Sequence, residues 1–431
     1  MISDFSKIKK VHFIGIGGIG ISAVARMMSL EGKEITGSDR DESEVTQELK
    51  KERISVTIGQ KAENIVAGID LVIYTVAIPE NNAELMKARE LGIECITYPQ
   101  ALAIISKDKF TIAVSGTHGK TTTTAMIAKM LIDAGMDPTV IVGSILKDQK
   151  SNFIAGKSKY LVVEACEYKR SFLNLHPNIL VITNIDDDHL DYYKDIEDIK
   201  SAFIELIGQV DSQGQVICDL ELPHIGDVAK KAKAEVIDYE LFGDINLELK
   251  VPGEHNLANA AAVLAVADVL KIPRADAKKS LEGFSGTWRR FEFKGETKNG
   301  ALVYDDYGHH PTEVEATLSG ARDLFPDKNI TVVFQPHLYS RTKQHLTHFG
   351  TSFKNVTNVI IAPIYAAREP VDPSISSELL AQEISKSGVS AQAMNSFDEI
   401  EKHLNTLKKG DVIMTMGAGD IYKVGEKILA H

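Results

Sequence analysis

Residues 111–124 carry the side chains best suited to holding a nucleoside triphosphate. They read TIAVSGTHGKTTTT, which is a β-branched apolar run, a turn with two glycines, Lys120, and four threonines that open a helical pattern. Backbone N–H groups of such a turn can face phosphate at a helix N-terminus, where the dipole favours negative charge. The Lys120 ammonium would reach the β and γ phosphates, and the Thr121 hydroxyl would hold Mg²⁺. Val114 stands where the strict motif has glycine, so an ordinary turn with a surface lysine is the alternative.

Two further apolar runs end in side chains that could meet this turn. YLVVE delivers Glu164 at its carboxyl end, and NILVITNIDDDH delivers three aspartates and His189. Glu164 offers hard oxygen ligands suited to Mg²⁺, whereas histidine is a less usual ligand. Taken alone, Asp187 is typical of a solvated loop and His189 of a structural histidine. In company with the turn, the pattern predicts Thr121, Glu164 and His189 as metal ligands. Cys166 is interpreted as a small buried residue.

A second glycine-rich turn lies near the N-terminus. Gly15-x-Gly17-x-x-Gly20 separates a strand pattern from a helix pattern, and the next strand, KEITGSD, ends in Asp39. Because Asp39 comes about 20 residues after the glycines, the stretch fits the dinucleotide fingerprint, in which a carboxylate meets a ribose hydroxyl. It predicts a nucleotide diphosphate at a helix N-terminus but does not specify nicotinamide, and a tight turn without a ligand is the alternative. A later strand, ending near residues 75–78, would face the same crevice.

The second half of the chain offers amide and guanidinium groups. Asn256 and Asn259 lie three residues apart on one helical face, so their amides could address a purine edge, although asparagine near a helix start is more often a cap. Arg289 and Arg290 follow a glycine-rich turn. Either could be a surface charge, but a pair at a hinge suits an arginine that reaches phosphate when domains close.

Polar side chains also follow four strand patterns in the C-terminal third. The first ends at DDYGHH, residues 305–310, and the second at HLYSR, residues 337–341. Pro311 is favoured in the first turn of a helix. Strand ends loaded with polar groups on one edge indicate a second ligand-facing crevice, and Glu313 and Glu315 are interpreted as ordinary charges on a helix surface.

Composition excludes several classes of protein. The chain has 431 residues, 44% of them hydrophobic and 25% charged, as in globular proteins with several cores. A net charge of −12 disfavours a nucleic-acid surface. Three cysteines without C-x-x-C spacing argue against a disulfide framework and a cysteine zinc site. No run has the ~18 apolar residues of a membrane helix. We expect a cytoplasmic protein without membrane insertion, either a monomer or a weak homodimer.

Strand and helix patterns alternate almost throughout the chain, which predicts an α/β fold with largely parallel sheets. Boundaries are placed where a charged stretch precedes the phosphate-loop strand and where the turn GFSGTW follows an alanine-rich helix. We expect a Rossmann-like domain at 1–107, a phosphate-loop ATPase domain at 108–287, and a second Rossmann-like domain at 288–431.

The motifs GIGGIGIS, GTHGKTTTT, TNIDDDHLDYY, GEHNLANA, RRFE, DDYGHHPTEVEATL, FQPHLYSRT and GAGDI occur in this order over nearly the whole chain. Together they resemble those of the ATP-dependent ligases that build the peptidoglycan stem peptide. The resemblance implies three domains, for the UDP sugar, for ATP and for the incoming amino acid. It points to the member that joins L-alanine to the lactyl carboxylate of UDP-N-acetylmuramate through an acyl phosphate, with ATP and Mg²⁺ as cofactors.

The resemblance also implies roles for individual residues. In the loop Gly116, Thr117, His118, Gly119, Lys120, Thr121 and Thr122 would bind ATP, and Lys120 would hold its γ-phosphate. Thr121, Glu164 and His189 would surround Mg²⁺, Asn256 and Asn259 would lie near the nucleotide, and Arg290 and Asp306 would complete the ATP site. Tyr307, His309 and Arg341 match positions associated with alanine, and Gly17, Gly18 and Asp39 match those that bind UDP.

Two departures from the family pattern leave alternatives open. Leu338 stands where many members have arginine, so binding of the alanine carboxylate would rest more on Arg341. After the retained Glu164, the chain reads ACEYKRSFL where many members have ADESDASFL, so neighbouring contacts to the sugar substrate would differ. One alternative is a recycling ligase that attaches a preformed peptide to the same sugar. Another, from a different class, is a nicotinamide-dependent oxidoreductase, which would leave Lys120 and Glu164 unexplained.

Overall fold

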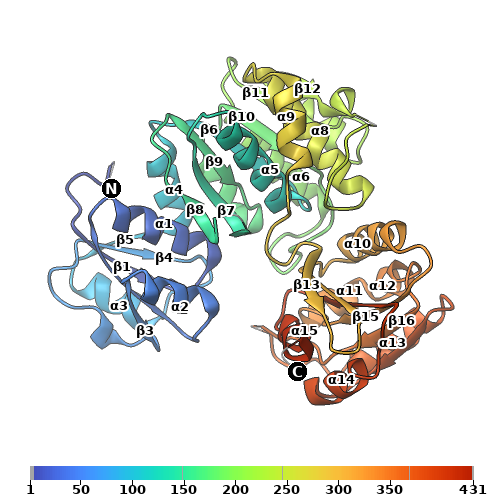
Figure 1. Cartoon of the computed structure of the whole chain (residues 1–431). Coiled ribbons are helices and arrows are strands. Elements are labelled where there is room, and N and C mark those ends of the chain that lie inside the picture. Colours follow the sequence, from blue (N-terminus) through green and yellow to red (C-terminus); the bar gives the residue numbers. More distant parts are fainter. Residues whose placement is uncertain (1–3, 148, 245, 368, 430–431) are drawn as a thin grey trace. The chain divides into compact units, whose positions relative to one another are not determined.

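The computed structural model describes residues 4–147, 149–244, 246–367 and 369–429. The chain forms three β-sheets, each covered by helices (Figure 1). Residues 1–245 and 259–281 form one compact unit, and residues 246–258 and 282–431 form the other. The first two sheets therefore belong to one unit and the third sheet to the second. The predicted α/β class, with three domains and mostly parallel sheets, is confirmed, whereas the exact domain boundaries stay predictions.

The N-terminal sheet is parallel, with strand order β3-β2-β1-β4-β5. Strand order reverses at β1, so the carboxyl ends of β1 and β4 flank the switch point where open sheets bind ligands. The strands are β1 (Lys10–Ile14), β2 (Glu34–Asp39), β3 (Ser55–Ile58), β4 (Leu71–Tyr74) and β5 (Glu94–Thr97). The helices are α1 (Ile19–Leu30), α2 (Glu44–Lys51), η1 (Ala62–Asn64), α3 (Ala83–Glu90) and α4 (Tyr98–Ser106).

The central sheet has the order β12-β11-β10-β6-β9-β7-β8 and is parallel except for the β7–β8 hairpin. Its strands are β6 (Phe110–Ser115), β7 (Thr139–Leu146), β8 (Ser151–Ile154), β9 (Tyr160–Glu164), β10 (Ile179–Ile182), β11 (Gln215–Cys218) and β12 (Glu235–Asp238). Its helices are α5 (Lys120–Asp133), η2 (Tyr168–Asn174), α6 (Ile196–Ile207), α7 (Ile225–Ala229), η3 (Tyr239–Phe242), α8 (Glu254–Val269) and α9 (Arg274–Glu282). The division between the two compact units runs through α8.

The C-terminal sheet has the order β13-β14-β18-β15-β16-β17, with only β13 antiparallel to its neighbour among the described strands. Its strands are β13 (Glu292–Glu296), β14 (Leu302–Asp306), β15 (Asn329–Phe334), β16 (Asn358–Ile361), β17 (Ser390–Ala393) and β18 (Asp411–Met416). Its helices are α10 (Pro311–Leu324), α11 (Tyr339–Gln344), α12 (Leu346–Ser352), α13 (Ser377–Ser385), α14 (Phe397–Leu404) and α15 (Tyr422–Leu429).

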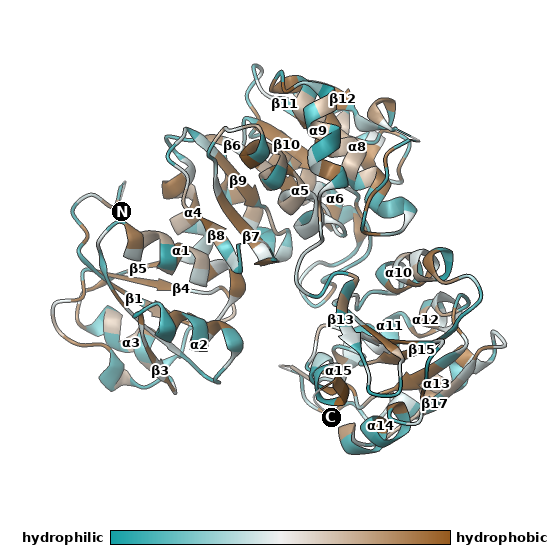
Figure 2. Ribbon diagram, viewed as in Figure 1, coloured by the Kyte–Doolittle hydropathy of each residue, from teal (hydrophilic) through white to brown (hydrophobic). Residues whose placement is uncertain are grey.

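The inner strands of the sheets lie in the apolar cores, and Figure 2 shows many of them in the brown of hydrophobic residues. Ile112, Val114 and Leu180, on β6 and β10, are fully buried. Each such side chain contributes about 1.5–3 kcal/mol when it is removed from water. The strands thus form a rigid base, and the loops at their carboxyl ends are free to carry polar groups. Within the described residues, no helix has both the length and the apolar character needed to cross a membrane.

A buried amide joins the first two sheets of the N-terminal unit. Asn152, on β8, donates to Ser22 Oγ at 3.0 Å and to the Ile19 carbonyl, both on α1. Its Oδ1 accepts from Arg26 Nη1 at 2.5 Å, and Arg26 Nε pairs with Glu52 at 2.8 Å. Because Asn152 is only 1% exposed, these hydrogen bonds replace water almost completely. Helix α1, which follows the first glycine turn, is thereby fixed to the central sheet.

Candidate active site

The phosphate loop lies between β6 and α5, as the sequence predicts. Gly116 has φ +129° and Gly119, the N-cap of α5, has φ +81°, values that favour glycine. A Cβ at Gly116 would collide with Thr183 Oγ1, and one at Gly119 would lie 2.7 Å from Asn259 Oδ1. Both glycines are therefore required by close approach as well as by backbone conformation. Asn259 lies directly against the loop, and its place near the nucleotide stays a prediction.

The loop that follows β10 holds the phosphate loop in shape. Asn184 Oδ1 accepts from His118 N at 2.8 Å, and Asn184 Nδ2 donates to the His118 carbonyl at 3.1 Å. Thr117 N donates to the Asn184 carbonyl at 3.1 Å. The His118 ring lies 3.0 Å from Asp186 Oδ2, while Asp187 is exposed. The acidic run is therefore divided between a structural contact and a solvated residue.

Lys120 contacts a carboxylate that the sequence did not single out. Its Nζ donates to the carbonyls of Gly116 and Thr117 at 2.5 and 2.9 Å, and lies 3.0 Å from Glu167 Oε2. Glu167 is 2% exposed, and its backbone carbonyl accepts from the Tyr193 hydroxyl. An acidic residue three positions after Glu164 was the only signal in the sequence. Glu167 completes the immediate surroundings of the phosphate-loop lysine.

Charge keeps Lys120 protonated despite its burial. Burial acts to lower the pKa of Lys120, but the nearby Glu167, Cys166 and Glu164 outweigh it and raise the pKa above its ordinary value. A buried ammonium remains charged only when such partners compensate for lost hydration. Lys120 is therefore a permanent positive charge at the helix N-terminus.

The predicted metal ligands form two groups. Glu164 Oε2 accepts from the Thr121 hydroxyl at 2.9 Å and from Gly143 N at 2.8 Å. His189 Nε2 lies 3.7 Å from Glu167 Oε1 and 3.9 Å from Asp188 Oδ2. The hydroxyl and carboxylate of the first group are hard oxygen donors of the kind that Mg²⁺ prefers. The first group therefore fits the predicted metal, and His189, which lies on the side of Glu167, stays a predicted ligand.

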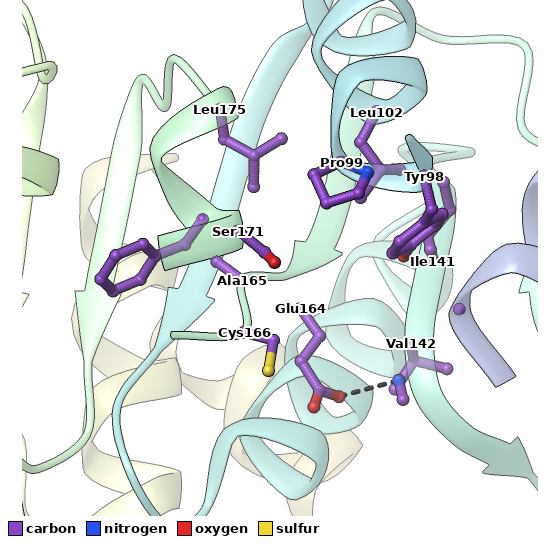
Figure 3. Close-up of a pocket in the computed structure, with 13 residues that line it drawn as sticks. Tyr98, Pro99, Leu102, Ile141, Val142, Glu164, Ala165, Cys166, Ser171 and Leu175 are labelled. Atoms are coloured by element: carbon purple, nitrogen blue, oxygen red, sulfur yellow. Dashed lines mark hydrogen bonds between the residues drawn. The ribbon is translucent and has the colours of Figure 1, made fainter. Parts of the chain in front are cut away.

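A cavity of about 180 Å³ lies beside Glu164 within the N-terminal unit (Figure 3). Tyr98, Pro99 and Leu102 of α4 line it together with residues of the central sheet. Its walls are mostly apolar, and the Glu164 carboxylate and Cys166 thiol project at one side. The prediction that Cys166 is buried is wrong, because the strand ends at Glu164 and the next residues turn along the cavity wall.

The side chain of Asp39, which follows the glycine turn in the N-terminal domain, hydrogen-bonds to that turn. Gly17 N donates to Asp39 Oδ2 at 2.8 Å, and Asp39 Oδ1 accepts from Arg40 N at 2.7 Å. Gly18 is the N-cap of α1 with an extended conformation. Gly17, Gly18 and Asp39 are thus brought together at the carboxyl end of β1. Asp39 braces the turn in this structure, and its predicted contact to a ribose remains a prediction.

In the second unit, Asp306 is the most deeply buried of the predicted site residues. Its two oxygens accept from Phe291 N at 2.8 Å and Gly308 N at 2.7 Å. Burial raises the pKa of Asp306 to about 6, although Arg290 opposes this effect. The Arg290 guanidinium lies 5.4 Å from the centre of the Tyr307 ring. Arg290, Asp306 and Tyr307 therefore form one cluster at the end of β14.

Glu313 was interpreted as an ordinary charge on a helix surface, and this interpretation is wrong. Its side chain is 11% exposed, accepts from His309 N at 3.0 Å and lies 3.7 Å from Arg290 Nη1. It also closes a capping box with His310 at the start of α10. Glu315, by contrast, is exposed as expected. Helical spacing alone could not distinguish a capping glutamate from a solvated one.

The two neighbouring arginines have different surroundings. Arg289 is 2% exposed, pairs with Asp305 at 2.7 Å and donates to the carbonyls of Gly417 and Gly419. It therefore ties the end of β18 to β14, whereas the Arg290 side chain is 27% exposed. Only Arg290 retains the access that a phosphate-binding role requires.

Predicted alanine-binding residues gather at the ends of β14 and β15. Arg341 Nη1 lies 3.0 Å from His337 Nδ1, and the His337 and His309 rings are 5.8 Å apart. Leu338, which replaces the common arginine, is buried and has φ +71°. Asn256 lies in the first turn of α8, and its side-chain amide donates to the Pro252 carbonyl at 2.7 Å.

Comparison with known families defines the class of the chain. Residues 10–110 match the Mur ligase family, catalytic domain; residues 114–243 match the Mur ligase middle domain; and residues 289–419 match the Mur ligase, glutamate ligase domain. The chain belongs to the Mur ligase family.

Individual relatives narrow this class. The UDP-N-acetylmuramate–L-alanine ligase of Clostridium kluyveri is 43% identical over an alignment 457 positions long, which covers 100% of both chains. The crystal structure of UDP-N-acetylmuramate–alanine ligase MurC from Thermotoga maritima matches with a TM-score of 0.83 and 29% identity, covering 98% of each chain. A murein peptide ligase from Psychrobacter arcticus shares the fold, with a TM-score of 0.74 at 23% identity and 98% coverage of each chain.

Proposed function

We propose that this protein is an ATP-dependent ligase that joins L-alanine to the lactyl carboxylate of UDP-N-acetylmuramate in peptidoglycan precursor synthesis. Full-length similarity to L-alanine ligases is the observation that carries the proposal. The geometry supports it, because a phosphate loop, a buried Lys120–Glu167 pair and a Thr121–Glu164 pair meet at one sheet edge. Such a set is suited to phosphoryl transfer and leaves no need for hydride chemistry.

The reaction divides into two steps. The lactyl carboxylate attacks the γ-phosphorus of ATP, which gives an acyl phosphate and ADP. The amine of alanine then attacks the acyl carbon, and phosphate leaves. Lys120 stabilises the charge that develops on the transferring phosphoryl group, since its ammonium is already oriented at the helix N-terminus. Glu167 holds that ammonium in place and keeps it charged.

Thr121, Glu164 and His189 are proposed to hold Mg²⁺. When bound, the ion would neutralise phosphate charge in the transferring group. The Thr121 hydroxyl and Glu164 carboxylate are already 2.9 Å apart, and Gly143 N orients the same carboxylate oxygen. Glu164 is therefore fixed before any ligand arrives, which lowers the cost of ordering the site.

The remaining predicted residues receive proposed roles by domain. Gly17, Gly18 and Asp39 would bind the UDP portion in domain 1–107. The loop of domain 108–287, with Asn256 and Asn259, would bind ATP, and Arg290 and Asp306 would complete that site from domain 288–431. Tyr307, His309 and Arg341 would address alanine. We further propose a cytoplasmic location and a monomer or weak homodimer.

Phosphate release with ATP, Mg²⁺ and UDP-N-acetylmuramate tests the proposal. The acceptors to be compared are L-alanine, glycine, L-serine and an L-Ala-γ-D-Glu-diamino acid tripeptide. We expect L-alanine to stimulate release most strongly. Stimulation by the tripeptide alone would replace the proposal with a recycling ligase, and Leu338 would then mark the altered pocket. Preferential binding of NADH over uridine nucleotides would instead favour an oxidoreductase.

A further inference from the structure

A strained turn follows Glu167 in the central domain. Lys169 and Arg170 have φ of +52° and +54°, a conformation that residues with a Cβ seldom adopt. Arg170 anchors the turn to α6, since its guanidinium lies 2.6 Å from Asp198 Oδ1 and 2.5 Å from Glu205 Oε1. Strained backbone of this kind persists where the surroundings enforce it, and it often occurs at functional sites.

The turn directs Lys169 to the N-terminal sheet. Lys169 Nζ donates to the Val76 carbonyl at 2.9 Å, and the side chain is exposed. Val76 follows Thr75 at the end of β4, and a Cβ at Gly15 would lie 2.6 Å from the Thr75 methyl. The ammonium of Lys169 therefore reaches the loop that packs on the first glycine turn. This is the switch point between β1 and β4, where open sheets bind ligands.

The two segments of the N-terminal domain that form the switch point carry no cationic side chain. The segments 13–22 and 71–79 contain no lysine or arginine. Asp39 adds a negative charge beside Gly17, and Arg40 pairs with Asp41 at 2.7 Å. A diphosphate at the glycine turn would meet backbone N–H donors and a carboxylate but no positive charge from these segments. Phosphate groups are usually bound with help from lysine or arginine.

We infer that Lys169, although it belongs to the ATP domain, is a further binding residue for the diphosphate of the UDP-sugar. The inference rests on the proposed function. Lys169 has a carbonyl oxygen as its hydrogen-bond acceptor here, and an anionic oxygen is the stronger acceptor for an ammonium. The diphosphate would therefore draw Lys169 from Val76, and the anchored Arg170 would keep the turn in place. The central domain thus contributes to both nucleotide sites.

Binding of UDP and of uridine to the full-length protein tests this inference. Lys169→Met keeps the length of the side chain and removes its charge. We expect it to weaken UDP binding about tenfold, as a lost charged hydrogen bond does, and to leave uridine binding unchanged. Lys169→Arg should retain most of the UDP affinity. The salt dependence of UDP binding should also become shallower in Lys169→Met.

A matched control is Lys230→Met, which removes an exposed lysine paired with Asp227 on α7. It should bind UDP as the wild type does. Equal UDP affinity in Lys169→Met and the wild type overturns the inference, and so does an equal loss of UDP and uridine affinity, which would mean that Lys169 only joins the two domains. If the wild type binds UDP-N-acetylmuramate but Lys169→Met is unaffected, only the inference fails. If the wild type binds no uridine nucleotide, the proposed function fails with it.

Discussion

The two glycine turns of the N-terminal unit have the same architecture but different chemistry. Each joins a buried parallel strand to a helix, β1 to α1 and β6 to α5. The first is braced by a carboxylate, because Gly17 N donates to Asp39. The second carries Lys120, whose ammonium lies against two carbonyls and Glu167. The first turn therefore offers an anion only its backbone N–H groups, whereas the second turn adds the largely buried ammonium of Lys120.

This difference matches the ligands that the two turns are proposed to hold. A UDP diphosphate only has to be bound, so backbone donors with one cation from elsewhere are sufficient. The γ-phosphoryl group of ATP has to react, and charge must be stabilised as it develops. A fixed ammonium and oriented carboxylates serve the second task. The comparison teaches that a shared strand-turn-helix unit becomes catalytic through the side chains that surround it.

Removing the cation of the second turn should have the largest effect. Lys120→Ala is expected to lower turnover by about a thousandfold, because no other group replaces the oriented ammonium. Binding of UDP-N-acetylmuramate, measured by calorimetry, should stay near the wild-type value. Lys129→Ala on the same helix, where Lys129 pairs with Asp133 at 2.9 Å, is the control and should remain active. Loss of UDP-sugar binding in Lys120→Ala would show that the two turns do not act separately.

Glu167→Gln tests whether the Glu167 carboxylate keeps the Lys120 ammonium protonated. We expect turnover to fall by roughly tenfold to a hundredfold, because Gln can accept a hydrogen bond but does not compensate the ammonium. Burial acts to lower the pKa of Lys120, and Glu167 opposes it. Without the carboxylate the pKa of Lys120 falls, so activity should decline on raising the pH towards about 10, where the wild type stays protonated. Glu197→Gln, which removes an exposed carboxylate paired with Lys200, is the control for the pH–rate profile.

A side chain added to the first glycine turn should weaken binding of the UDP-sugar. In Gly17→Ala, the added Cβ would lie 2.8 Å from Asp39 Oδ2 and 2.9 Å from the Thr46 methyl, so the turn must shift. We expect the KM for UDP-N-acetylmuramate to rise about tenfold, as overpacking typically costs 1–3 kcal/mol. The KM for ATP should not change. Gly243→Ala, where an added Cβ is 3.4 Å from the nearest atom, serves as the control. An equal rise in both KM values would contradict the separation of the turns.

The sequence predicted the parts of this site that depend on local patterns. Gly119 and Lys120 follow a buried strand and open a helix, so their relation is set within a few residues. Glu164 was predicted because parallel strands end at a common edge. Glu167 was missed because it lies beyond the end of β9, so its approach to Lys120 depends on how the chain turns after Glu164. The left-handed conformations of Lys169 and Arg170 that follow were not predictable either, since residues with a Cβ seldom adopt them.

Prediction of the fold from the sequence has the same limit. Alternating strands and helices indicate parallel α/β sheets, since apolar runs of this length must be buried on both faces. The pattern does not reveal which residues join two sheets. Asn152 is an ordinary polar residue in the sequence, yet it is buried against a helix more than a hundred positions earlier. Contacts of this kind depend on the packing of whole elements and have no local signature.

Asn152 offers the subtlest test of the two turns, because it fixes α1 to the central sheet and contacts the first turn through the Ile19 carbonyl. Asn152→Ala would leave Arg26 Nη1 and Ser22 Oγ without this partner, and we expect unfolding free energy to fall by about 2 kcal/mol. Small displacement of one bound substrate relative to the other slows reaction without weakening binding, so kcat should fall about fivefold with both KM values unchanged. Thermal unfolding and steady-state kinetics measure the two effects, with the exposed Asn299→Ala as control. An unchanged kcat in a destabilised Asn152→Ala would mean that this amide stabilises the unit but does not align the two turns.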